Sequence, residues 1–212
     1  MDHRRKPNAR RRAEATNTGK ALKLEVFTTL KEMLMRGLLG LDPNTNLVRL
    51  HPSYYSRDRG KEINFDVSIE LTIPGASTPS LLWIWECKDY ESAIPARIVS
   101  EFHGNLEEIG ADGTKGTIIT RGTYQESAIK LAESRRMGLA RLLPDAQVDW
   151  VVHRMLRGGL RRSSVPETHE ALTKPQFSAE NQNLYGFTAN GRTMVGLSFA
   201  SFVKLSLEEW GL

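Results

Sequence analysis

Apolar and polar positions follow two periods along the first 145 residues, and these periods predict a mixed α/β domain. Residues 21–39 place apolar side chains three to four positions apart, which is typical of one face of an amphipathic helix. Residues 63–73 alternate at every second position, which is typical of a half-buried strand. The same rules predict strands at 47–55, 81–90, 116–120 and 139–143 and helices at 94–110 and 124–137. The order helix, three strands, helix, strand, helix, strand implies a mixed sheet flanked by helices.

The segment LLWIWECKDY, residues 81–90, reads as a buried strand that ends in charges. Both of its faces are apolar in the first half, which is typical of a strand covered on both sides. Glu86 and Lys88 share one face, and Cys87 lies on the other. An unpaired charge there would cost on the order of several kcal/mol, so each charge needs a partner. Asp66 lies on the polar face of the preceding strand, and it approaches Glu86 if the two strands pair as a hairpin.

An aspartate, a glutamate and a lysine at one sheet edge suit the hydrolysis of a phosphodiester. Asp66 and Glu86 would supply hard oxygen ligands for Mg²⁺, and the backbone carbonyl of Cys87 is placed to be a third ligand. The metal would polarise the phosphate and acidify a bound water, which Lys88 would orient. The alternative is a structural ion pair between Glu86 and Lys88, tied to Asp66 and Arg59.

These motifs resemble the PD-(D/E)XK, or restriction-endonuclease-like, superfamily, and within it the Mrr-like restriction endonucleases. The resemblance rests on Asp66 in NFDVSIEL, on Glu86 and Lys88 in WIWECKDY, and on the downstream segment GTKGTIITRGTYQESAIKLAESRRMGLARL. It covers residues 21–145, and it implies a nuclease core with the element order αβββαβαβ. It also implies that Glu25, on the first helix, assists near the metal. The sequence departs from the superfamily's name in one place, because phenylalanine and not proline precedes Asp66.

We therefore expect a metal-dependent endonuclease that hydrolyses DNA with Mg²⁺ or Mn²⁺, of the restriction or genome-defence type. Asp66 and Glu86 would bind the metal, and Lys88 would position the attacking water. One alternative is a Holliday-junction-type resolvase, which shares these three residues. Another is a non-catalytic nucleic-acid-binding or regulatory module that retains the nuclease fold. A homodimer is compatible with each of these readings.

The positive charge is concentrated in the first 20 residues. The 212-residue chain has a net charge of +4, while residues 1–20 hold seven basic and two acidic residues. This segment has no hydrophobic periodicity, so we expect a disordered basic tail that favours a polyanion, with a merely solvated tail as the alternative. The side chains expected to contact DNA are Arg4, Arg5, Lys6, Arg10, Arg11, Arg12, Arg59 and Gln125. A helix-capping turn is the alternative role for Gln125 and for Thr120.

Composition restricts the remaining possibilities. A 40% apolar and 25% charged chain is typical of a soluble globular protein, and no run reaches the roughly 18 apolar residues of a membrane span. The single cysteine, Cys87, excludes an internal disulfide and favours a reducing, cytoplasmic setting. Residues 146–212 are expected to form an accessory segment with a β-hairpin near residues 184–199. An arginine-rich stretch at residues 154–162 could line a DNA path or form a solvated loop.

Overall fold

The computed structural model describes residues 9–73, 75–90, 92–110, 113–144, 148–149, 164–180, 182–190 and 199–211. The strands are β1 (Leu47–Leu50), β2 (Ser53–Ser56), β3 (Lys61–Asn64), β4 (Val67–Leu71), β5 (Leu81–Lys88), β6 (Thr114–Thr120), β7 (Gly138–Leu142), β8 (Val148–Asp149), β9 (Ala179–Glu180) and β10 (Leu184–Phe187). The helices are α1 (Ala9–Met35), α2 (Ala96–Gly110), α3 (Glu126–Ser134), α4 (Val165–Thr173) and α5 (Phe199–Glu209).

Six of these strands form one mixed sheet in the order β1-β4-β5-β6-β7-β10. β5 runs antiparallel to β4, with Val67 opposite Trp85, and parallel to β6, with Glu86 opposite Ile118. β7 continues the sheet parallel to β6, and β10 closes it as an antiparallel strand. The β4–β5 hairpin and the two parallel crossovers confirm the predicted α/β fold class, a mixed sheet flanked by helices.

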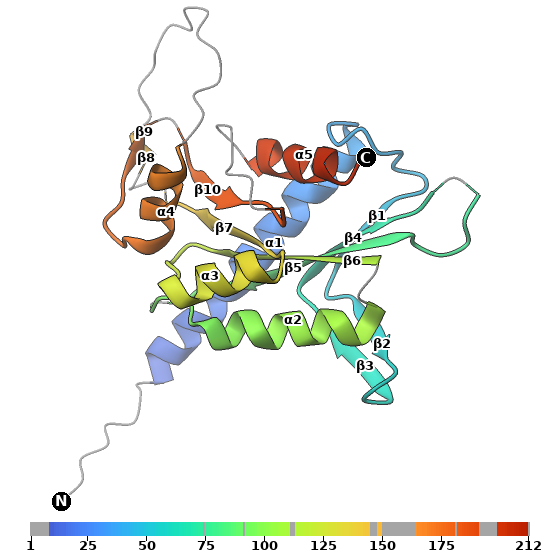
Figure 1. Ribbon diagram of the computed structural model, residues 1–212, viewed down its shortest axis with the longest axis horizontal. Helices are drawn as coiled ribbons and strands as arrows, with labels where there is room; N and C mark the ends of the chain where they lie inside the picture. Colours follow the sequence, from blue (N-terminus) through green and yellow to red (C-terminus); the bar gives the residue numbers. More distant parts are fainter. Residues whose placement is uncertain are drawn as a thin grey trace, which may run out of the picture.

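Helices cover both faces of the sheet (Figure 1). α1 and α5 pack on one face, over Trp83, Trp85 and Cys87, and α2 and α3 pack on the other, over Ile84 and Ile118. This arrangement explains why both faces of β5 are apolar, since its two tryptophans and Ile84 are fully buried in different layers.

Two of the predicted strands are each interrupted. The predicted strand 47–55 is divided into β1 and β2 at His51, whose φ is +53°, and the predicted strand 63–73 is divided into β3 and β4. Phe65 consequently packs in the layer of α2 and α3, whereas Val67 packs in the layer of α1. The expectation that these two side chains share one face is wrong, because the chain crosses from the β2–β3 hairpin into the main sheet at Asp66.

The first helix begins earlier than expected. α1 starts at Ala9, so it includes residues 9–20, which were expected to belong to a disordered tail. Alanine, arginine, glutamate and lysine are strong helix formers, and a helix that is anchored further along by buried residues such as Leu22 and Val26 needs no apolar stripe here. The expected DNA contacts Arg4, Arg5 and Lys6 lie outside the described residues.

The C-terminal segment is more closely joined to the core than an accessory lobe would be. β10 pairs with β7, and α5 buries Phe202 and Val203 against the layer of α1. α4 also lies in this segment, and it begins with a capping box between Ser164 and Glu167. β10 is the first arm of the expected hairpin, but residues 191–198 lie outside the described part of the chain, as do the arginines of residues 154–162.

In the described residues, no helix combines the length and the hydropathy that crossing a membrane would require.

Candidate functional site

Asp66 and Glu86 come together where β4 begins and β5 ends. Val67 lies opposite Trp85, so Asp66 and Glu86 occupy the next position on each strand. The carboxylate Oδ2 of Asp66 accepts a hydrogen bond from the backbone N–H of Cys87 at 2.9 Å. This bond closes the end of the hairpin and brings the two predicted acids to one edge of the sheet.

Lys88 completes the predicted set. Its Nζ lies 2.5 Å from Oε1 of Glu86, two residues earlier on the same strand, and both side chains are largely shielded from solvent. Arg59, which the structural alternative placed in the same group, instead pairs with Glu108 through Nε at 2.6 Å. The acid–acid–lysine set therefore forms without Arg59.

The electrostatics of the site are set by two carboxylates and the lysines that face them. Burial raises the pKa of Glu86, and the nearby charge of Asp66 raises it further, while Lys88 opposes both effects. Burial acts to lower the pKa of Lys88, but the Glu86 carboxylate outweighs it and the pKa is raised. Two carboxylates held this close disfavour each other's ionisation, and a bound cation relieves that cost.

Cys87 itself is a core residue. Its side chain is 3% exposed and lies in the layer of α1 and α5, facing away from Glu86. Burial raises the pKa of its thiol well above the ordinary value, so the thiol stays protonated. Only the backbone of Cys87 is available to the site.

Lys23 of α1 is a site residue that the sequence reasoning missed. Its Nζ lies 2.6 Å from Oδ1 of Asp66, so both oxygens of this carboxylate are engaged. Lys23 is adjacent to Leu22, which is fully buried, and this position directs it toward the sheet edge. A helix residue next to the buried stripe is the only signal that the sequence offers for it.

Glu25 lies in a neighbouring group of charges. It forms an ion pair with Arg121, which follows β6, and Arg121 also approaches Asp89 at 3.4 Å. The structure thus brings Glu25 to the same end of the sheet as Lys88, since Thr120 lies opposite Lys88. Glu25 therefore pairs with Arg121, whereas the α1 residue that pairs with Asp66 is Lys23.

The other expected DNA contacts are dispersed. Arg10, Arg11 and Arg12 belong to the first turn of α1, where the structure describes the backbone and not the side chains. Gln125 is the N-cap residue of α3, and its exposed side chain makes no capping hydrogen bond. Thr120 accepts a hydrogen bond from the backbone N–H of Gly122 at 3.0 Å, which agrees with the turn reading of this residue.

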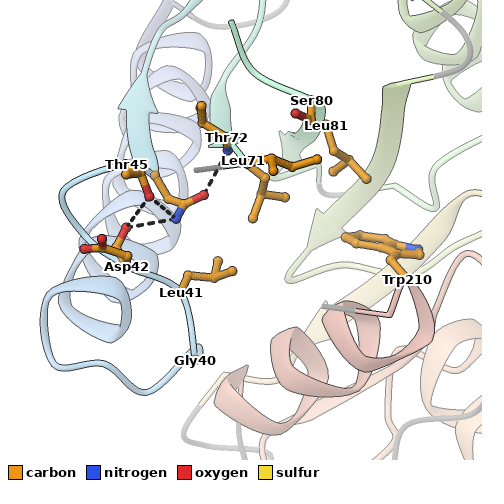
Figure 2. Close-up of a pocket in the computed structure, with 11 residues that line it drawn as sticks. Gly40, Leu41, Asp42, Thr45, Leu71, Thr72, Ser80, Leu81 and Trp210 are labelled. Carbon is orange, nitrogen blue, oxygen red and sulfur yellow. Dashed lines mark hydrogen bonds between the residues drawn. The ribbon is translucent and has the colours of Figure 1, made fainter. Parts of the chain in front are cut away.

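A hollow at the opposite end of β5 takes no part in this site (Figure 2). It has a volume of about 490 Å³ and an apolar lining that includes Leu41, Leu81 and Trp210. Its polar residues are Asp42, Thr45, Asn46, Thr72 and Ser80, and the side chain of Asn46 bonds to the backbone of Asp42 and of Thr72 at 2.8 and 3.0 Å. The apolar part of the lining predominates, and none of the proposed site residues borders the hollow.

The donor set at Asp66 and Glu86 fits a hard divalent cation. In the described stretches, no three side chains of His, Cys, Asp or Glu cluster as a metal site. A cation would rely on the two carboxylates and the Cys87 carbonyl, with water and phosphate oxygens as its remaining ligands. This is an all-oxygen set of the kind that Mg²⁺ and Mn²⁺ prefer.

Comparison with known proteins agrees with this chemistry. Residues 52–143 match a family model described as Restriction endonuclease (Mrr_cat), a range that includes Asp66, Glu86 and Lys88. The match confirms the predicted relationship to the Mrr-like branch of the PD-(D/E)XK nucleases, a family that generally uses divalent metals. No curated protein and no solved structure gives a significant match.

Proposed function

We propose that this protein is a metal-dependent endonuclease that hydrolyses DNA phosphodiester bonds. The observation that carries the proposal is the convergence of Asp66, Glu86 and Lys88 at one sheet edge, within the range that matches the Restriction endonuclease family model. The family description supports a restriction role, and a part in genome defence and activity in the cytoplasm complete the proposal.

The side chains have distinct tasks in this proposal. Asp66, Glu86 and the carbonyl of Cys87 would hold the cation, Mg²⁺ or Mn²⁺. When bound, the cation would act as a Lewis acid toward the phosphate and toward a water. Lys88 donates a hydrogen bond from Nζ to the attacking water and offsets the negative charge that develops on the phosphate. Lys23 balances the charge of Asp66 from the helix side.

Cleavage of linear, plasmid and branched DNA with Mg²⁺, Mn²⁺, Ca²⁺ or EDTA tests the proposal. Glu86→Gln and Lys88→Met should each lower the rate at least about 100-fold, because each removes a group that acts on the transition state. Glu133→Gln and Lys130→Met change the same charges on the exposed side of α3 and serve as controls. Wild-type rates in both site variants would overturn the assignment.

A non-catalytic binding module is the second candidate, and one observation favours it. Each carboxylate of the site already has an internal ammonium partner, Lys23 for Asp66 and Lys88 for Glu86. A protein that binds DNA without cutting it would show a gel shift in EDTA and no cleavage with any metal. Preferential cleavage of the branched substrate would instead indicate a junction resolvase.

A further inference from the structure

An open groove lies between α1 and the edge strand β1, beside Asp66. It has a volume of about 650 Å³, and its lining comprises Phe27, Val48, Arg49, Leu50, His51, Pro52, Ser53 and Glu70. The backbone N–H of His51 donates to the carbonyl of Asp66 at 2.9 Å, so the groove reaches the position next to the proposed metal ligand. It is therefore a continuation of the candidate site.

One residue of α1, Phe27, lines this groove, and Lys23 and Lys31 lie about one helical turn to either side of it. Lys23, Phe27 and Lys31 are spaced four apart, which places them on one face of the helix. Lys23 contacts Asp66, and the Nζ of Lys31 lies 5.5 Å from the centroid of the Phe27 ring. Lys31 is exposed, so this helix face presents an available ammonium group.

The strand side of the groove carries one base, Arg49, and one acid, Glu70, which pair with each other. Arg49 binds Glu70 through Nε at 2.6 Å, and the hydroxyl of Tyr54 donates to the same carboxylate oxygen at 2.9 Å. Glu70 is thus compensated within the protein, while half of the Arg49 side chain stays exposed. The groove consequently carries no unbalanced acid.

His51 adopts a strained backbone conformation in this lining. Its φ of +53° lies in the left-handed region, which costs a residue other than glycine on the order of 1 kcal/mol. Its side chain is exposed, so the strain is not repaid by burial of the ring. Strained backbone conformations cluster at active sites and ligand clamps, and in this chain one also occurs at Arg136, in the turn after α3.

We propose that this groove binds the sugar–phosphate backbone of the DNA strand that is cut, leading it to Asp66 and Glu86. Lys31, Arg49 and His51 contact successive phosphates, and Phe27 packs against the sugars between them. This inference rests on the proposed function, because it takes the scissile phosphate to lie at the acid pair.

Binding measured without cleavage tests the groove. The affinity for a short fluorescein-labelled DNA duplex is followed by anisotropy in EDTA and Ca²⁺ over a series of salt concentrations. Lys31→Ala combined with His51→Gly, which tolerates the positive φ, should weaken binding about tenfold and reduce the salt slope by about 1.

A control that removes more positive charge than the groove variant comes from the other end of β6. Lys115 and Arg135 line a separate hollow of about 200 Å³. At the usual strand rise, Lys115 lies about 17 Å along β6 from Thr120. Lys115→Ala with Arg135→Ala removes two basic groups there and should leave affinity within about twofold of wild type.

The outcomes separate the groove from the nuclease assignment. Unchanged affinity and salt slope in the groove variant, or an equal loss in the control, overturns the groove even if wild-type protein cleaves DNA. Weakened binding in the groove variant alone supports the groove. If the wild-type protein then cleaves DNA with none of the tested metals, only the nuclease assignment is overturned.

Discussion

The carboxylate of Asp66 is oriented by the backbone N–H of Cys87, which donates to its Oδ2 at 2.9 Å. The bond links the residue before β4 to the penultimate residue of β5, and it leaves Oδ1 to face Lys23. The direction of this carboxylate is therefore set by the β4–β5 hairpin, and a cation would find it already in place.

Two substitutions of Asp66 distinguish the role of its charge from the role of this hydrogen bond. Asp66→Asn keeps an oxygen for the Cys87 N–H, whereas Asp66→Ala removes the acceptor and leaves a buried donor unpaired. Both variants should lose metal-dependent cleavage by at least about 100-fold, and only the alanine variant should lose a further 1 kcal/mol or so of unfolding free energy. Cleavage assays and urea denaturation measure the two effects. An asparagine variant that cleaves at nearly the wild-type rate would rule out Asp66 as a metal ligand.

Phe202 of α5 tests how strongly the C-terminal helix supports β5. The side chain is fully buried, and its ring centroid lies 5.9 Å from that of Trp85. Phe202→Ala should lower the free energy of unfolding by about 3–5 kcal/mol, as for other large core deletions. Val165→Ala, at a position that is 65% exposed, is the control and should change it by less than about 0.5 kcal/mol. A small effect at Phe202 would show that α5 is not part of the core.

Gly186 tests the attachment of β10 to the main sheet. A Cβ at this position would lie 2.3 Å from the carbonyl oxygen of Leu139 and 3.0 Å from the Cα of Ala140. Gly186→Ala should therefore disrupt the pairing of β10 with β7 and lower the melting temperature. Gly104→Ala meets no atom within 4 Å on α2, so it should stabilise the protein by up to about 1 kcal/mol. Equal melting temperatures for the two variants would contradict the register of this pair.

Glu108 gives a pH-dependent test of the contact between the β2–β3 hairpin and α2. Hydrogen bonds from Arg59 and Ser56 lower the pKa of Glu108. A lowered carboxyl pKa contributes stability above the ordinary glutamate pKa of about 4.3, and this contribution is lost as the pH falls through the lowered value. Glu108→Gln should thus lower the melting temperature at neutral pH by an amount that shrinks in acid. Glu133→Gln controls for the loss of one exposed carboxylate, and a difference that grows in acid would contradict the ion pair.

The strand β5 and its site could be predicted because their signals are local. The apolar run before Glu86 fixes the strand and both of its faces, and the hairpin loop brings β4 back to it. Asp66 then follows from the pairing of two adjacent strands. Lys23 could not be found in this way, because its contact with Asp66 joins a helix and a strand that are distant in sequence.

The errors in the fold also have identifiable physical causes. The alternation of residues 63–73 continues unbroken through Phe65 and Asp66, so it gives no sign that the chain changes layers there. α4 has few apolar residues, but the capping box formed by Ser164 and Glu167, with Pro166 in the first turn, was a readable start signal. For residues 9–15 helix propensity carried the information and hydrophobic periodicity did not, whereas the weak helix formers at residues 16–19 gave neither signal.

The packing of α5 against β5 has a consequence for the order of events during synthesis. The ring centroids of Trp83 and Trp210 lie 4.7 Å apart in an edge-on arrangement, and those of Trp85 and Phe199 lie 5.3 Å apart. The tryptophans of β5 are therefore packed against residues that are synthesised long after them. Until residue 210 has been made, this face of the strand that carries Glu86 and Lys88 is covered by α1 but lacks the α5 side of its cover. The packing around the strand that holds the proposed site is therefore complete only when the last helix has been made.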